Sequence, residues 1–151
     1  MIQRTKGRMA LCAVFLALLL AFIWGNSALP GQQSGQVSGW VGAVLETLLP
    51  FLDLNSPQGL HILRKLAHFS EFAALGACLA WMGAMTVRPS ALRLGLPLLG
   101  GVAAAVADET IQAFSPGRNS SLVDVAIDSA GVATGLAVFT LAVWLWHKRK
   151  K

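Results

Sequence analysis

The sequence predicts an all-α integral membrane protein, a bundle of about four transmembrane helices with a short interfacial helix between spans one and two. Two observations carry this prediction. The chain is 55% hydrophobic and only 13% charged, against about 25% charged for an ordinary soluble domain. So little charge cannot cover a soluble surface, so part of the surface must face lipid. The apolar residues also fall in long runs, and the first run, residues 9–29, contains no charge.

The apolar runs set the expected spans within one domain, residues 1–151. The first run would reach about 31 Å as a helix, enough to cross the hydrocarbon core of a bilayer. Its basic start and the small residues at its end also resemble a signal peptide. We expect the run to stay uncleaved because it is longer than a usual signal core. The four spans are expected at residues 9–29, 63–87, 94–113 and 122–146.

A segment between the first two spans has a different character. A link rich in Gly, Gln and Ser occupies residues 30–39, and a short helix is expected at residues 40–49. Apolar residues recur there at helical spacing until Pro50 interrupts the pattern. The segment is too short to span a bilayer, so we expect this helix to lie at the membrane interface.

Turn and cap signals separate the later spans. Arg88 and Pro89 predict a turn after the second span. The stretch 115–118 (Ser-Pro-Gly-Arg) predicts a tight turn, because Pro presets φ and Gly accepts a positive φ. Ser121 is the expected N-cap of the last span, with Asp124 placed three residues later in a capping arrangement.

The distribution of basic residues predicts the topology. Four crossings put both termini on one side of the membrane. With both termini cytoplasmic, nine of the twelve Lys and Arg residues lie inside: three near the N-terminus, two between spans two and three, and four at the C-terminus. This asymmetry favours a multi-pass protein of the plasma membrane with cytoplasmic termini. The basic clusters border apolar runs, so they indicate a lipid bilayer as partner and no nucleic acid. The sequence leaves the oligomeric state open.

Polar residues gather at the outer end of the predicted bundle. Ionisable groups in membrane spans are costly, so several together require a specific explanation. Spacings of three, four or seven place those of the second span on one helical face. The other members come from the ends of spans three and four and the turn between them, so we expect a charged pocket that opens outward. The candidate ligand-binding residues are Arg64, Lys65, His68, Glu71, Asp108, Glu109, Gln112, Arg118, Asp124 and Asp128.

A purely structural role is the alternative for these residues. Buried carboxylates paired with Arg or Lys can lock helices together, and His68 could simply bond to Glu71 or Asp108. Taken one at a time, each of these residues is better explained by a structural role. Their convergence at one end of the bundle favours a ligand-binding site. Cys12 and Cys78 lie in apolar runs without metal-ligand spacing. We therefore interpret them as small hydrophobic residues, and we predict no metal or cofactor.

The polar residues form two motifs that resemble the VanZ-like membrane family. The first motif is Arg-Lys-Leu-Ala-His-Phe at 64–69, followed by Glu-Phe at 71–72 and Leu-Gly at 75–76. The second begins with Asp-Glu-x-x-Gln at 108–112 and continues through Ser-Pro-Gly-Arg at 115–118, Ser-x-x-Asp at 121–124 and Gly-x-x-x-Gly at 131–135. Asp128 stands where the family more often has Asn. The resemblance covers about residues 60–140. It implies an association with resistance to the glycopeptide antibiotic teicoplanin, with no established reaction.

Two classes of function remain open. The first is a non-catalytic protein that binds a lipid-linked wall precursor or a lipoglycopeptide, with Arg64, Lys65 and Arg118 holding a phosphate or carboxylate. The second is a membrane-embedded enzyme acting on a lipid-linked phosphate or amide. In that case the four Asp and Glu residues at 108, 109, 124 and 128 would hold a divalent cation. His68 and Glu109 would be the catalytic candidates. Without an obvious nucleophile, binding is favoured over catalysis. Transport ranks third because the inner halves of spans two to four carry almost no polar residues.

Overall fold

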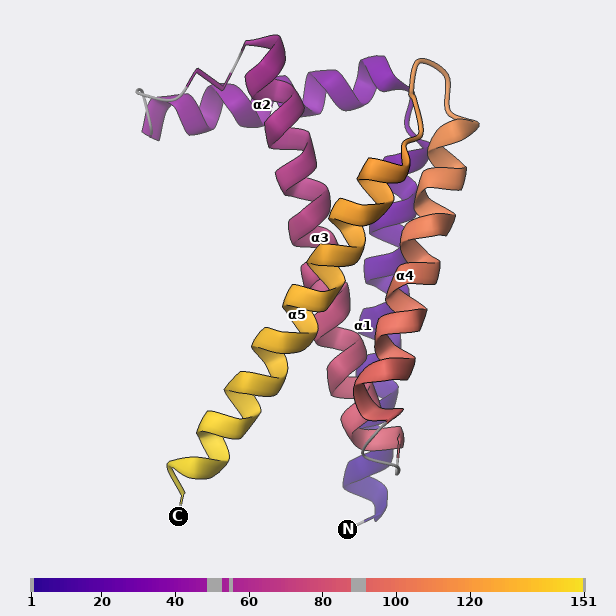
Figure 1. Ribbon diagram of the computed structural model, residues 1–151, viewed down its shortest axis with the longest axis vertical. Helices are drawn as coiled ribbons and strands as arrows, with labels where there is room; N and C mark the ends of the chain where they lie inside the picture. Colours follow the sequence, from indigo (N-terminus) through magenta and orange to yellow (C-terminus); the bar gives the residue numbers. More distant parts are fainter. Residues whose placement is uncertain (1, 49–52, 55, 88–91, 151) are drawn as a thin grey trace.

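The computed structural model is all-helical in the residues it describes, which are 2–48, 53–54, 56–87 and 92–150 (Figure 1). The helices are α1 (Ile2–Ala28), α2 (Gly31–Leu48), α3 (Pro57–Thr86), α4 (Leu92–Ala113) and α5 (Leu122–Lys148). Among the described residues, α1, α3, α4 and α5 are long and apolar enough to cross a membrane. The predicted multi-pass, all-α architecture is therefore confirmed.

The helix α2 lies across one end of the bundle (Figure 1). The start of α3 and the loop 114–121 between α4 and α5 lie at the same end, which we call the α2 end. The first turns of α1 and the last turns of α5 lie at the opposite end (Figure 1). This arrangement agrees with four crossings and with both termini on one side of the membrane.

Two expected boundaries were wrong. Residues 31–39 of the expected link are helical and form the first half of α2, which is continuous over eighteen residues. Its first turn is anchored where the Gly31 amide donates to the carbonyl of Pro116 at 2.9 Å, so a tertiary contact outweighs the low helix propensity of Gly and Ser. The helix α3 begins six residues before the expected position 63, at Pro57, and the Ser56 side chain accepts from the Gly59 amide. The predicted interruption at Pro50 and the turn at Arg88 and Pro89 lie outside the described residues.

Glycines bring α3 and α5 into backbone contact. A Cβ atom added to Gly76 of α3 would lie 2.1 Å from the carbonyl oxygen of Val132. From the other helix, a Cβ on Gly131 would lie 2.5 Å from the carbonyl oxygen of Phe69, and one on Gly135 would lie 1.8 Å from that of Ala73. Real Cβ contacts are never this short, so only glycine permits the crossing. The Gly-x-x-x-Gly stripe is thus a helix-packing motif.

The core forms around this crossing. Phe72, Leu75, Ala105 and Val132 are buried there, together with Ile23 of α1. Large apolar side chains elsewhere on the spans point outward and are exposed, as a lipid-facing surface requires. On α4, a Cβ added to Gly101 would meet the side chain of Val132, whereas nothing lies within 4 Å of a Cβ added to Gly100.

The last turns of α5 carry the features of a membrane interface. Trp144 and Trp146 are exposed there. The ammonium groups of Lys148 and Lys150 lie 5.1 and 4.7 Å from the centroids of these two rings. Aromatic and basic side chains together are typical of a helix end at the headgroup level.

A pair of thiols joins α1 to α3. Cys12 and Cys78 are both buried, and their sulfur atoms lie 3.8 Å apart. We expect a membrane-permeant oxidant such as copper–phenanthroline to link them within one chain, because their sulfur atoms already lie in contact between α1 and α3. Intact-mass spectrometry would detect the loss of two hydrogens, and Cys78→Ala is the control. Failure of the wild type to oxidise would contradict this packing of α1.

Candidate functional site

The predicted polar residues surround a cavity of about 450 Å³ at the α2 end. Its walls come from α3, α4, α5 and the loop 114–121. Of the ten candidate residues, the cavity is lined by Arg64, Lys65, His68, Glu109, Gln112, Arg118, Asp124 and Asp128. Asp108 is fully buried, and Glu71 lines a neighbouring depression of about 340 Å³ beside α2. The structure therefore brings these residues together, while their binding role stays a prediction.

Arg118 presents unused donors at this cavity. Its Nη2 donates to the carbonyl of Asn26 at 3.1 Å, which ties the loop to the end of α1. Its Nε and Nη1 atoms are buried without a hydrogen-bond partner. Burial lowers the pKa of Arg118, and the charge of Arg64 lowers it further, against opposing effects of Asp108, Glu109 and Glu71. Two neighbouring guanidinium groups with free donors form a natural anion site.

The other two basic residues of the cavity differ in how firmly a protein partner already holds them. Lys65 Nζ donates to Asp124 Oδ1 at 2.7 Å, and each of the two side chains is 29% exposed. An ion pair at such exposure contributes up to about 1 kcal/mol. Arg64 Nη2 lies 3.5 Å from His61 Nδ1, a distance at the limit of a hydrogen bond. Arg64 is therefore freer than Lys65 to meet a ligand.

Glu109 holds the loop to the start of α5. The predicted cap at Ser121 is confirmed, because its side chain accepts from the Val123 amide at 3.1 Å. The expected capping role of Asp124 was wrong, since its carboxylate pairs with Lys65. Glu109 Oε2 instead accepts from the Ser121 amide at 2.8 Å. The predicted turn at 115–118 is confirmed by a φ of 72° at Gly117.

This role of Glu109 gives a prediction for stability. Glu109→Ala should lower the free energy of unfolding by about 1–3 kcal/mol, because the partly buried Ser121 amide loses its acceptor. Glu109→Gln keeps a carbonyl oxygen and should cost less. Thermal unfolding of the detergent-purified variants would check this order. Equal midpoints for both variants would contradict it.

Polar residues at the end of α1 were missed from the sequence. Ser27 is fully buried. Its carbonyl accepts from Ser115 Oγ at 2.9 Å, and its hydroxyl accepts from Gln112 Nε2 at 3.4 Å. The carbonyl of Asn26 holds Arg118. The signal in the sequence is the polar pair Asn26 and Ser27 at the end of the first apolar run, which also resembles a signal-peptide cleavage site.

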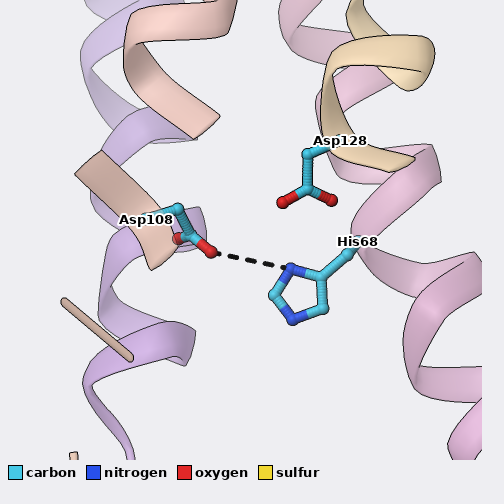
Figure 2. A group of neighbouring side chains, drawn as sticks. All are labelled: His68, Asp108 and Asp128. Atoms are coloured by element: carbon cyan, nitrogen blue, oxygen red, sulfur yellow. Dashed lines mark ion pairs between the residues drawn. The ribbon is translucent and has the colours of Figure 1, made fainter. Parts of the chain in front are cut away.

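His68, Asp108 and Asp128 meet where α3, α4 and α5 converge, and their side chains point toward one another (Figure 2). His68 Nδ1 lies 3.8 Å from Asp108 Oδ2, too far for a hydrogen bond. Gln112 Nε2 donates to the same Asp108 oxygen at 2.8 Å. This group differs from the four carboxylates expected as metal ligands, because Glu109 is bonded to Ser121 and Asp124 to Lys65. Its atoms could share a proton or hold a cation.

Comparison with protein-family models matches residues 12–144 to the model described as VanZ/LLP1. The match extends well beyond the motif-bearing residues 60–140 and includes most of α1 and all of α2. Comparisons with curated proteins and with solved structures found no match. The family model covers nearly the whole chain and includes every residue of the cavity, so the chain belongs to the VanZ/LLP1 family.

Proposed function

We propose that this protein binds the phosphate-bearing headgroup of a lipid-linked cell-wall precursor at the outer leaflet of the plasma membrane. The observation that carries the proposal is Arg118, whose Nε and Nη1 are buried at the cavity without a partner. Arg64 adds a second guanidinium to the same wall. Guanidinium groups bind phosphate with paired, charge-assisted hydrogen bonds. A lipoglycopeptide carboxylate would satisfy the same donors.

The proposal requires the α2 end to face outward. Basic residues accumulate at the two termini, which lie at the opposite end of the bundle (Figure 1). By the positive-inside rule, this distribution supports cytoplasmic termini and a cavity at the outer surface. In this orientation α2 lies at the interface, with exposed Val37, Trp40 and Val44 available to the membrane.

The depression beside α2 offers a place for the lipid chain. It shares Arg64, His68 and Arg118 with the polar cavity. The rest of its lining is mostly apolar or small, including Val41 and Leu63. A headgroup held by the two arginines could therefore extend its first isoprenoid units beneath α2. Such a pairing of a polar head site with an apolar channel suits an anionic polyprenyl lipid.

The family supports a consequence for antibiotic action. The VanZ-like family is associated with teicoplanin resistance, and glycopeptides act on wall precursors outside the cell. If the protein bound a precursor, or the drug itself, fewer complexes between drug and precursor would form. We therefore propose that the protein lowers susceptibility to glycopeptides.

Direct binding tests the proposal. Purified protein in phosphatidylcholine nanodiscs should retain long-chain polyprenyl phosphate through washing, in preference to phosphatidylglycerol. Arg64→Ala should weaken retention about tenfold, the loss of one charge-assisted contact. Lys148→Ala removes a cation at the opposite end and should leave retention unchanged. Equal retention of both anionic lipids, or no effect of Arg64→Ala, would refute the proposal.

A membrane-embedded enzyme is the alternative, and the group of His68, Asp108 and Asp128 is the observation that favours it. His68 would act as general acid or base on a lipid-linked phosphate or amide. Glu109 is the other catalytic candidate, although its carboxylate already holds the Ser121 amide. Release of inorganic phosphate from polyprenyl pyrophosphate, abolished by His68→Ala, would favour this alternative over simple binding.

A further inference from the structure

We infer that His68, Asp108 and Asp128 form a binding site for a divalent transition-metal ion, best suited to zinc, at the base of the polar cavity. One candidate ligand atom from each residue lies within 4.8 Å of the other two. The three residues come from three different spans (Figure 2). The site adjoins the proposed lipid-binding site but uses other side chains, because neither arginine belongs to it.

Unpartnered atoms point to a ligand between these side chains. Asp108 is 0% exposed and Asp128 is 1% exposed. Even so, Asp108 Oδ1, Asp128 Oδ2 and His68 Nδ1 are buried without a hydrogen-bond partner. Buried carboxylate oxygens without partners are costly, and the three groups face one another (Figure 2). A cation between them would satisfy all three residues at once.

The charge of the group matches a divalent ion. Two ionised carboxylates and a neutral imidazole carry two negative charges, which a divalent cation would cancel. Of the cationic side chains of the cavity, Lys65 is held by Asp124 and Arg118 by the carbonyl of Asn26. A neutral cluster is far less costly than two buried anions where three spans meet.

The donor set selects the kind of metal. An imidazole nitrogen suits zinc and other transition metals, whereas magnesium and calcium prefer oxygen ligands alone. Zinc–ligand distances near 2.1 Å place tetrahedral ligand atoms about 3.4 Å apart. The 3.8 Å between His68 Nδ1 and Asp108 Oδ2 needs only a small adjustment.

The surroundings of the three residues resemble those of a metal site in which one coordination position is not filled by the protein. Gln112 donates to Asp108 Oδ2 at 2.8 Å and would orient that ligand, as outer hydrogen bonds do at metal centres. His68 and Asp128 also line the cavity. Three protein ligands would leave the fourth position of zinc directed to the cavity, open to water or to a ligand oxygen.

Metal content and cobalt spectroscopy test the inference. Full-length protein, purified in detergent without chelators, should contain about one zinc per chain. After removal of zinc with a chelator, cobalt should bind and give the visible absorption bands of a tetrahedral site. Asp108→Asn and Asp128→Asn should each lose most of the zinc. Asp53→Asn, which changes an exposed acid outside the cavity, should keep it.

Three outcomes would overturn the inference. The first is wild-type protein without zinc that also gives no cobalt bands, because the carboxylates would then be neutralised by protons alone. The second is full zinc content in Asp108→Asn or Asp128→Asn protein that elutes as a single folded species. The third is equal loss of zinc in Asp53→Asn. The cobalt spectrum of the wild type decides the matter if the asparagine variants do not fold. Polyprenyl phosphate retention by the same samples reports separately on the lipid-binding proposal.

Discussion

Gly135→Ala is expected to destabilise the bundle severely, by about 3 kcal/mol or more, at the upper end of overpacking effects. The added Cβ would lie 1.8 Å from the carbonyl oxygen and 2.7 Å from the carbonyl carbon of Ala73. Both contacts are with backbone, so no side chain can rotate away. The helices α3 and α5 would have to separate at their crossing, which also holds the backbone of Val132 against Gly76.

The measurement is the thermal midpoint and the yield of monodisperse protein in detergent, compared with Gly100→Ala. Nothing lies within 4 Å of a Cβ added at Gly100. Alanine also favours a helix over glycine by about 1 kcal/mol, so this control should be as stable as the wild type or more so. Similar midpoints for the two variants would show that α3 and α5 do not cross in backbone contact.

The contrast between these two glycines shows which parts of the fold the sequence could predict. Long apolar runs predicted the four spans, because length and hydropathy alone decide membrane insertion. Helix boundaries needed tertiary information. The start of α2 depends on the contact of Gly31 with Pro116, eighty-five residues away in the chain. The role of Gly135 likewise follows from its partner Ala73 on another helix.

The candidate site was predictable in composition but not in pairing. Helical spacing placed the polar residues of α3 on one face, and the α4–α5 turn placed Arg118 near them. Which carboxylate meets which partner depends on how the helices rotate against each other. Glu109 therefore bonds the Ser121 amide, the role expected of Asp124, while Asp124 pairs with Lys65 and His68 joins Asp108 and Asp128. Asn26 and Ser27 entered the site from α1, a span that carries no charged residue at this end.

Arg118→Ala is expected to abolish any rise in the teicoplanin inhibitory concentration that the wild-type protein gives a susceptible Gram-positive host. The change removes the two unpartnered donors of Arg118, Nε and Nη1. Loss of a charge-assisted contact of about 1.5–3 kcal/mol corresponds to binding weaker by about tenfold to a hundredfold. The comparison includes empty vector and Glu109→Gln at matched membrane levels, with vancomycin as the control drug. If Arg118→Ala cells kept the full rise in the teicoplanin inhibitory concentration, Arg118 would have no part in resistance.

Arg118→Lys separates ligand binding from folding. Arg118 also ties the loop to the carbonyl of Asn26, so the alanine variant could lose activity through instability. Lysine keeps the positive charge and can still donate to one carbonyl, but it lacks the planar fork that meets a phosphate with two parallel hydrogen bonds. A lysine variant with the wild-type thermal midpoint and no teicoplanin effect would assign the resistance to the guanidinium group itself. A lysine variant that retains the full effect would mean that charge alone suffices, and the paired-donor geometry proposed for this cavity would be wrong.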